Sequence, residues 1–475
     1  MLRSNPLFLA FGLAAALTST PVSAQVVTVD TLSWTGPTAN RINIVFLGDG
    51  YTAQELDRFS DWSRDAFDSL FLNSKNPTRF YVDHKSMFNA FAIRTASTQS
   101  GVSHPSSGIN KSTFYGCSFG GNWTTGSCNR NKAMQTAAKY LPEYSAMIMV
   151  FNDQGGLRAT GGDPIYLPEG DYIHVVKHEL GHNLADLGDE YEEAGRTGDC
   201  GETPNTTAET RREFIKWSRW ILPATPIPSL TAIKTTTGLF EGANYQSSGC
   251  YRPEYDCLMR SYTGYDNGKL VQFCRPCAEE MIVKAYQTVS PIDSSLPAPG
   301  TVTVALHEHR EFRVKPLAVP TIAVSWIVDG VAAPGAVSPT FALPDLAAGN
   351  HTLAAIVRDT TSAVRKMTYV LADTARWTVR VDAITSLARS GSGMVGGFEY
   401  SGRRLSLDLE QPGRVTIRRM NALGRTGRAL AASESRPAGK AAWAVPAGGI
   451  LSVTVTPAEG GGPVFHKILG PSPSR

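Results

Sequence analysis

Two histidines and the glutamate between them form the part of this sequence best suited to chemistry. His178, Glu179 and His182 fit the pattern H-E-x-x-H within a chain of 475 residues. On a helix, residues i and i+4 lie about 40° apart and one turn along the axis, so both imidazoles can bind one metal ion. Glu179 then lies beside the metal, where its carboxylate can take a proton from an attacking water. The pattern is typical of zinc-dependent hydrolases.

The residues around this motif predict a helix with one apolar face. If His178 is set at 0° on a helical wheel, His182 falls near roughly 40°. The apolar residues fall on the opposite side, between about 160° and 240°. They are Ile173, Val176, Leu180, Leu184 and Leu187. One face is therefore suited to burial, which argues against a surface helix that carries two solvated histidines.

A catalytic zinc site usually has three protein ligands, so one more is needed here. Asp186, Asp189 and Glu190 follow the motif. Asp186 continues the i, i+4 series, but it would lie about 12 Å along the axis from His178, so we expect it to cap or solvate the helix end. Gly188 offers a position where the chain can turn with positive φ and bring Asp189 back. We predict Asp189 as the third ligand, with Glu190 as the alternative.

The N-terminus predicts export. One arginine, an apolar run and Val22-Ser23-Ala24 are typical of a secretory signal peptide, here residues 1–24. The apolar run is short, and no later stretch approaches about 18 apolar residues, so we expect no membrane span. The mature protein is expected to be secreted or periplasmic. A formal net charge of +3, spread along the chain, argues against nucleic acid as a partner.

All seven cysteines lie in the middle part of the chain. In an exported protein the default is disulfides, here with one thiol left over. Cys117 and Cys128 bracket a short loop and are predicted to pair. The alternative for the others is a structural zinc site formed by Cys250, Cys257, Cys274 and Cys277. We favour disulfides, because the oxidising compartment outweighs this loose spacing.

Strands that alternate with helices predict a mixed α/β sheet in the first 290 residues. The predicted strands are Ile42–Leu47, Met87–Thr95, Ser145–Phe151 and a short edge strand at Asp163–Leu167. Helices are expected after a capping box at Thr52–Glu55, near Lys132–Tyr140 and near Cys277–Tyr286.

The pattern changes after a Pro/Ser linker at Val289–Gly300. The segments TVTVAL, IAVSWIVDG, HTLAAIVRD, RKMTYVL and WTVRV predict an immunoglobulin-like β-sandwich over residues 291–384. A second small β-domain is predicted over residues 385–475, after a Gly/Ser linker. His307 and His309 lack a third ligand nearby and are not expected to bind metal.

With these residues established, the first 290 positions resemble the IgA-peptidase family of secreted bacterial metallopeptidases. The motifs that carry the resemblance occur in one order: LGDGYT (47–52), FNAFAIRTASTQSGV (88–102), HELGHNLADLGDEY (178–191), GLFEGANYQSSGCYRPEYDCLM (238–259) and FCRPC (273–277). The resemblance implies a metzincin-like zincin catalytic domain over residues 25–290. In such a domain a mixed twisted sheet lies above the active-site helix, and a smaller subdomain lies below it.

The resemblance also implies a role for each site residue. His178, His182 and Asp189 match the ligands of one catalytic Zn²⁺, and Glu179 matches the general base. Met259 matches the Met-turn, whose side chain would lie beneath the metal. The metzincin pattern proper has glycine three residues and histidine six residues after the second motif histidine, whereas this chain has alanine and glycine there.

Tyr262, three residues after the Met-turn, is a candidate donor to the developing oxyanion. The sequence therefore predicts a secreted zinc endopeptidase that acts on extracellular proteins or glycoproteins, with Glu179 as general base. The alternatives are a catalytically inactive adhesin or binding protein, and a zinc amidase that acts on cell-wall peptides. The C-terminal β-domains are expected to bind glycan, protein or a cell surface.

Overall fold

The structure is a computed structural model. It describes residues 27–71, 80–121, 125–154, 162–170, 173–233, 236–261, 265–266, 269–306, 308–382, 395–401, 404–420, 426–445, 450–458 and 465–469. These residues divide into two compact units. The first contains those up to Val289, together with Ala318–Pro320 and Thr361–Val370, and the second contains the rest. The predicted signal peptide lies outside the described residues, as do most of the second linker and His307.

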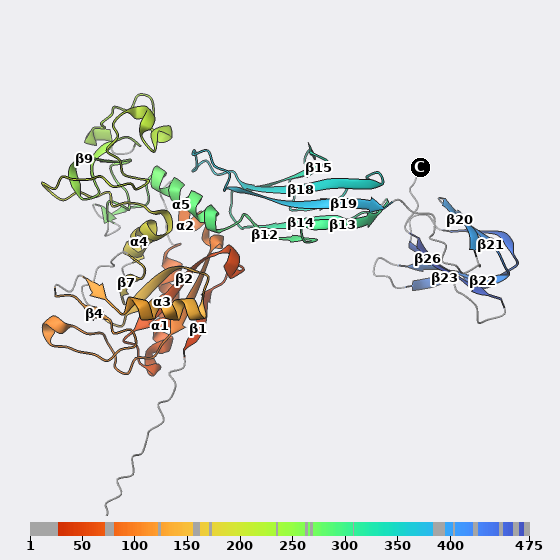
Figure 1. Ribbon diagram of the computed structural model, residues 1–475, viewed down its shortest axis with the longest axis horizontal. Coiled ribbons are helices and arrows are strands. Elements are labelled where there is room, and N and C mark those ends of the chain that lie inside the picture. The colour runs from red at the N-terminus through yellow and green to blue at the C-terminus, as the bar shows by residue number, and fades with distance from the viewer. Residues whose placement is uncertain are drawn as a thin grey trace, which may run out of the picture. The chain divides into compact units, whose positions relative to one another are not determined.

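A five-stranded sheet forms the centre of the first unit (Figure 1). Its strand order is β1 (Thr28–Ser33), β3 (Phe88–Arg94), β2 (Ile42–Asp49), β6 (Tyr144–Phe151) and β7 (Ile165–Pro168). β1 pairs antiparallel with β3, and the other neighbours are parallel. Every residue of β2 is buried, as expected for a central strand that is covered on both faces. The predicted mixed α/β sheet is confirmed.

Within the described residues of the first unit there are five α-helices. They are α1 (Leu56–Ser69), α2 (Phe80–Asp83), α3 (Arg130–Tyr140), α4 (Ile173–Ala185) and α5 (Arg275–Thr288). The predicted capping box is present, since Thr52 and Glu55 satisfy each other's backbone N–H groups ahead of a 3-10 turn that leads into α1. α4 and α5 pack side by side (Figure 1), so the helix that carries His178 rests on the helix that carries Cys277.

The remaining parts of the first unit are short. They comprise the β-pairs β4 (Ser118–Phe119) with β5 (Gly126–Ser127), β8 (Phe240–Ala243) with β9 (Gln246–Arg252), and β10 (Tyr265–Asp266) with β11 (Lys269–Leu270). The 3-10 helices are η1 (Thr38–Asn40), η2 (Ala53–Glu55), η3 (Lys85–Met87), η4 (Pro105–Ser107), η5 (Arg212–Phe214), η6 (Ser218–Trp220) and η7 (Thr231–Ile233).

The cysteines only partly follow the prediction. Cys117 and Cys128 form the predicted disulfide, and a second disulfide joins Cys200 to Cys250. The remaining cysteines, Cys257, Cys274 and Cys277, are free and buried. The prediction of a single leftover thiol was therefore wrong. Cys250 is also unavailable to the alternative zinc site, because its sulfur is bonded to Cys200.

The second unit consists of strands. One pair of sheets has the orders β12-β14-β17 and β13-β19-β18-β15-β16, and the next pair has β20-β21-β24 and β23-β22-β25-β26. The strands are β12 (Ile292–Leu296), β13 (Gly300–Ala305), β14 (Glu311–Pro316), β15 (Ile322–Val328), β16 (Val331–Ala332), β17 (Thr340–Ala342), β18 (Gly349–Asp359), β19 (Ala372–Asp382), β20 (Val395–Ser401), β21 (Arg404–Leu409), β22 (Gly413–Met420), β23 (Thr426–Arg436), β24 (Gly439–Ala444), β25 (Ile450–Pro457) and β26 (Phe465–Leu469). The three-part division of the mature chain remains a prediction.

One predicted strand of this region is wrong. The segment RKMTYVL (365–371) forms no strand, and Thr361–Val370 belongs to the first unit. The reason is a contact with a residue distant in the sequence: the backbone N–H groups of Arg365 and Lys366 donate to the carboxylate of Glu279 on α5 rather than to a neighbouring strand. In the second unit itself, Trp326 is buried and stacks on Trp377 and Phe341, so its core packs without a disulfide. Among the described helices, none combines the length and hydropathy needed to cross a bilayer.

Candidate metal centre

α4 brings the two motif histidines together. His178 is buried, and its Nε2 lies 3.2 Å from Nε2 of His182. On the apolar side of the helix, Val176 and Leu180 are almost fully buried. The predicted apolar face is thus buried at Val176 and Leu180, whereas Leu184 is only half-buried, and the burial fixes which way both imidazoles point.

The helix ends one turn before the third acid, but not at the predicted residue. Asp186 takes the left-handed conformation, with φ of 53°, whereas Gly188 is not among the residues with positive φ. Asparagine and aspartate tolerate this region better than most residues, which explains why Asp186 can make the turn. Gly188 serves close packing instead, since a Cβ there would lie 2.5 Å from Oγ1 of Thr203. The side chain of Asp186 is exposed and pairs with Lys284 at 2.8 Å.

After this turn the chain returns Asp189 to the histidines. Oδ1 of Asp189 lies 3.0 Å from Nε2 of His178 and 3.3 Å from Nε2 of His182. Glu190, the alternative ligand, lies elsewhere, within a group of cysteine sulfurs. The structure therefore brings together the three predicted ligands and separates them from the fallback residue.

The outer nitrogens of both histidines are held by backbone carbonyls. Nδ1 of His178 lies 3.0 Å from O of Leu258, and Nδ1 of His182 lies 2.5 Å from O of Leu187. A carbonyl can only accept, so each Nδ1 carries a hydrogen and each neutral ring directs the Nε2 lone pair inward. Oδ1 of Asp189 is buried without a hydrogen-bond donor. Three electron-rich atoms thus converge, and a cation among them would stabilise the arrangement.

The distances between these atoms fit a small tetrahedral ion. Zinc–nitrogen bonds are about 2.0–2.1 Å long, so two ligand atoms of a tetrahedral zinc lie about 3.3 Å apart. The three separations here are 3.0, 3.2 and 3.3 Å. His178, His182 and Asp189 therefore fit a metal ion, and a fourth position is left for a non-protein ligand.

Glu179 lies in the same cluster. A carboxylate oxygen of Glu179 and one ring nitrogen from each motif histidine all lie within 4.8 Å of one another. The residue is 6% exposed. Burial raises the pKa of Glu179 above its ordinary value, against the opposing effect of the two histidines. A carboxylate with a raised pKa is a better proton acceptor than an ordinary one.

Tyr245 is a site residue that motif reasoning missed. Its hydroxyl donates to Oδ2 of Asp189 at 2.5 Å, and Tyr191 donates to Tyr245 at 3.1 Å. Burial, and then Asp189, raises the pKa of Tyr245, so the phenol stays a donor. Burial would raise the pKa of Asp189, but the nearby imidazoles of His178 and His182 and the hydroxyl of Tyr245 outweigh it and hold that pKa well below its usual range.

Tyr245 lies at the turn between β8 and β9 with φ of 65°. The only sequence signal for this residue was its place inside the GLFEGANY motif, because a lone tyrosine has no diagnostic spacing. Tyr262, the predicted oxyanion donor, lies outside the described residues.

Met259 packs against the motif helix. It is fully buried, and a Cβ at Gly181 would lie 2.7 Å from its sulfur. Gly181 stands next to His182 in the motif, so a glycine there lets the methionine approach the turn that carries the ligands. The backbone N–H of Glu190 donates to O of Met259 at 2.8 Å. This bond ties residues 186–190, the ligand loop, to the segment that contains Met259.

Comparison with known proteins agrees with this geometry. The sequence profile of the IgA peptidase M64 family matches residues 31–236 and 229–284. The chain belongs to this family. It is therefore a member of a metallopeptidase family, and it carries candidate metal-binding groups. No curated protein matches the sequence.

Several solved structures show weak similarity to this chain. The Bacteroides ovatus mixed-linkage glucan utilization locus protein SGBP-B, in complex with a heptasaccharide, is 13% identical over 38% of this chain and 45% of its own, with a TM-score of 0.15. The fibronectin(III)-like modules of Clostridium thermocellum CbhA are 16% identical over 19% of this chain and 95% of theirs, also with a TM-score of 0.15. The β-glucuronidase of Parabacteroides merdae is 12% identical over 40% of this chain and 26% of its own, with a TM-score of 0.16. TM-scores this low do not establish a shared fold.

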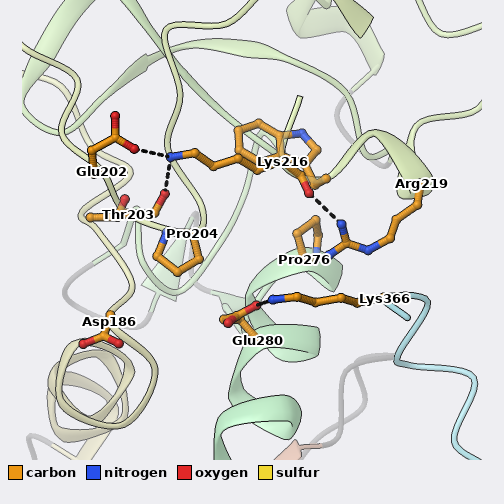
Figure 2. Close-up of a pocket in the computed structure, with 10 residues that line it drawn as sticks. Asp186, Glu202, Thr203, Pro204, Lys216, Arg219, Pro276, Glu280 and Lys366 are labelled. Carbon is orange, nitrogen blue, oxygen red and sulfur yellow. Dashed lines mark hydrogen bonds and ion pairs between the residues drawn. The ribbon is translucent and has the colours of Figure 1, made fainter. Parts of the chain in front are cut away.

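A separate pocket of about 490 Å³ lies beside the C-terminal end of α4 (Figure 2). Its lining comprises Asp186, Glu202, Thr203, Pro204, Lys216, Trp217, Arg219, Pro276, Glu280 and Lys366. Charges of both signs pair across it, with Lys216 on Glu202 at 3.6 Å and Lys366 on Glu280 at 3.2 Å. The three ligand candidates do not line this pocket.

Proposed function

We propose that this chain is an exported zinc endopeptidase that hydrolyses peptide bonds of extracellular proteins. One observation carries the proposal: Nε2 of His178, Nε2 of His182 and Oδ1 of Asp189 lie within 3.3 Å of one another, with the buried Glu179 beside them. Two neutral imidazoles and one carboxylate are a ligand set found in catalytic rather than structural zinc sites.

The proposed reaction assigns each residue one task. His178, His182 and Asp189 would hold the metal, which when bound polarises the scissile carbonyl and acidifies water. Glu179 accepts the proton of the attacking water and delivers it to the leaving amine. Tyr245 fixes the orientation of the Asp189 carboxylate through its hydrogen bond to Oδ2. The roles of these residues and the identity of the metal are part of the proposal.

The finer fold assignment is also a proposal. A metzincin-like catalytic domain is supported by the sheet of mixed direction, by the motif helix and by Met259 packed against Gly181. An immunoglobulin-like sandwich over residues 291–384 is supported by alternating burial along β13 and β19, typical of strands that cover a core with one face. For the C-terminal strands we propose attachment to glycan, protein or a cell surface.

The proposal is tested by metal removal and return. The full chain, purified after export, is assayed on casein and gelatin before and after treatment with a chelator, and then after addition of Zn²⁺. We expect chelation to abolish cleavage and zinc to restore it. A zinc-loaded protein that cleaves neither protein nor a proteome-derived peptide library would overturn the proposal. Release of peptides from a cell-wall digest alone would favour the amidase instead.

A further inference from the structure

The three free cysteines meet at one point with Glu190. Cys257 precedes the Met-turn, Cys274 is the N-cap of α5, and Cys277 lies in the first turn of that helix. One carboxylate oxygen and the three sulfurs all lie within 4.8 Å of one another. None of the four residues is more than 3% exposed. Three separate segments thus deliver four metal-ligating side chains to one buried site.

Glu190 lacks the partners that a buried acid needs. Its Oε1 accepts hydrogen bonds from Asn205 at 2.8 Å and from Cys277 at 3.0 Å, whereas its buried Oε2 has no hydrogen-bond partner. If the group is ionised, its charge is buried beside three sulfurs and is offset by these hydrogen bonds and by the Coulomb attraction of Arg252. If it is protonated, the hydroxyl has no acceptor. In either form Oε2 stays without a hydrogen-bond partner.

The geometry fits a tetrahedral ion bound by thiolates. Zinc–sulfur bonds are about 2.3 Å long, so two sulfurs on one zinc lie about 3.8 Å apart. Sγ of Cys257 and Sγ of Cys277 are 3.8 Å apart. Zinc–oxygen bonds of about 2.0–2.2 Å place oxygen and sulfur roughly 3.5 Å apart. Oε1 of Glu190 lies 3.0 Å from Sγ of Cys277 and 3.9 Å from Sγ of Cys274, so one distance is shorter and the other longer than this expected value.

The surroundings of Cys257 also favour a thiolate over a disulfide. The backbone N–H of Cys274 donates to the sulfur of Cys257 at 3.2 Å. Cys274 and Cys277 lie at the N-terminal end of the 14-residue α5, where the helix dipole stabilises negative sulfur. A disulfide between any two of the three would need sulfurs about 2.05 Å apart, and it would leave a third thiol and Glu190 uncompensated.

We propose that Glu190, Cys257, Cys274 and Cys277 form a second metal site that holds a structural Zn²⁺. All four positions are filled by the protein and buried, as in structural rather than catalytic zinc sites. Glu190 follows the catalytic ligand Asp189, and Cys257 lies two residues before Met259. The ion would therefore fasten the ligand loop and the Met-turn to α5. This inference does not depend on the peptidase activity.

Metal content of the full chain, purified after export, tests the second site. Wild type is expected to contain two zinc ions per chain. The double variant His178→Ala/His182→Ala is expected to keep one, and Cys274→Ser/Cys277→Ser is expected to lose the other. The matched control, Cys117→Ser/Cys128→Ser, removes two cysteines elsewhere and should keep both ions. A folded histidine variant that contains no metal would overturn the site.

Two measurements avoid reliance on cysteine variants, which can fail to fold. Cobalt bound to the histidine variant should show the thiolate-to-metal charge-transfer absorption that a site without sulfur lacks. Wild type, denatured with chelator but without reductant, should take up an alkylating reagent on three cysteines. Labelling of a single cysteine would mean a disulfide and would refute the proposal. The two proposals can fail separately. If the chain cleaves no protein, the peptidase proposal fails, but the expected cobalt spectrum and cysteine labelling stay the same.

Discussion

Asp189 and Glu190 are neighbours in the chain, yet they serve two clusters of different character. Asp189 faces two histidines, and the side chain of His182 remains 26% exposed. Glu190 is fully buried among three cysteines. A site that must admit water and substrate needs such an opening, whereas a site that only fastens segments together does not. The difference in exposure supports the proposed catalytic role of the histidine cluster and the proposed structural role of the cysteine cluster.

A second contrast lies between two buried acids. Glu279 on α5 is as buried as Glu190, but it accepts hydrogen bonds from Arg219, Trp220 and two backbone N–H groups. Burial raises the pKa of Glu279, but Arg219 and Trp220 outweigh it, so that pKa is lowered. The pKa of Glu190 is raised by burial. Glu279 is thus satisfied by protein groups, whereas Glu190 still lacks a partner on Oε2.

The largest expected effect comes from Glu179→Gln. This variant keeps the shape of the side chain but cannot accept a proton, so kcat should fall by about 10²–10⁴-fold. Metal content should stay unchanged, because the residue is not a ligand. Casein cleavage and zinc analysis on the same preparation measure both. Glu202→Gln, at an exposed position, is the control, and loss of metal from Glu179→Gln would contradict the assignment.

The pair Asp189→Asn and Glu190→Gln tests the comparison between the two clusters directly. Asp189→Asn should lower the affinity of the histidine cluster for zinc by more than the roughly 100-fold that loss of a hydrogen-bond partner of a ligand can cause. Glu190→Gln should leave that affinity intact and weaken the cysteine cluster.

Metal titrations of the two variants against wild type distinguish the sites. The assignment of Asp189 as third ligand would be wrong under one outcome. In that outcome Glu190→Gln loses the zinc ion of the histidine cluster, whereas Asp189→Asn keeps both zinc ions.

Tyr245→Phe should have a smaller effect on the same site. The variant removes the hydrogen bond to Oδ2 of Asp189, and loss of such an outer partner typically costs about 10–100-fold in metal affinity or activity. Tyr191→Phe, one hydrogen bond further out, is the matched control and should cost less. Equal losses in both variants would mean that the two tyrosines act through packing rather than through Asp189.

The smallest effect concerns the pH dependence of stability. Because the folded pKa of Glu279 is lowered, its contribution is fully present above the ordinary glutamate pKa of about 4.3 and is lost as the pH falls through the folded value. Glu279→Gln should lower the free energy of unfolding by about 2 kcal/mol at neutral pH. The deficit should shrink as the pH falls below about 4. Urea unfolding at both pH values measures this, and a deficit independent of pH would contradict it.

Much of the first unit followed from local patterns. The strands at β2, β3 and β6 and the helices α1, α3 and α5 were predicted within a few residues, because apolar periodicity and capping act over short distances. The predictions failed where contacts with residues distant in the sequence determined the local backbone conformation. Arg365 and Lys366 bond to Glu279 instead of extending a strand, and the turn after α4 is made by Asp186 instead of Gly188.

The sequence by itself determined the two histidines and the base, because their spacing on one helix fixes their geometry, and its ordered motifs pointed to the family. Only the tertiary structure decided which acid joins them, that Tyr245 supports that acid, and that three cysteines converge on Glu190. These residues come from separate segments of the chain. Their meeting depends on how α4 packs on α5 and on the path of the loops between them, which no local pattern encodes.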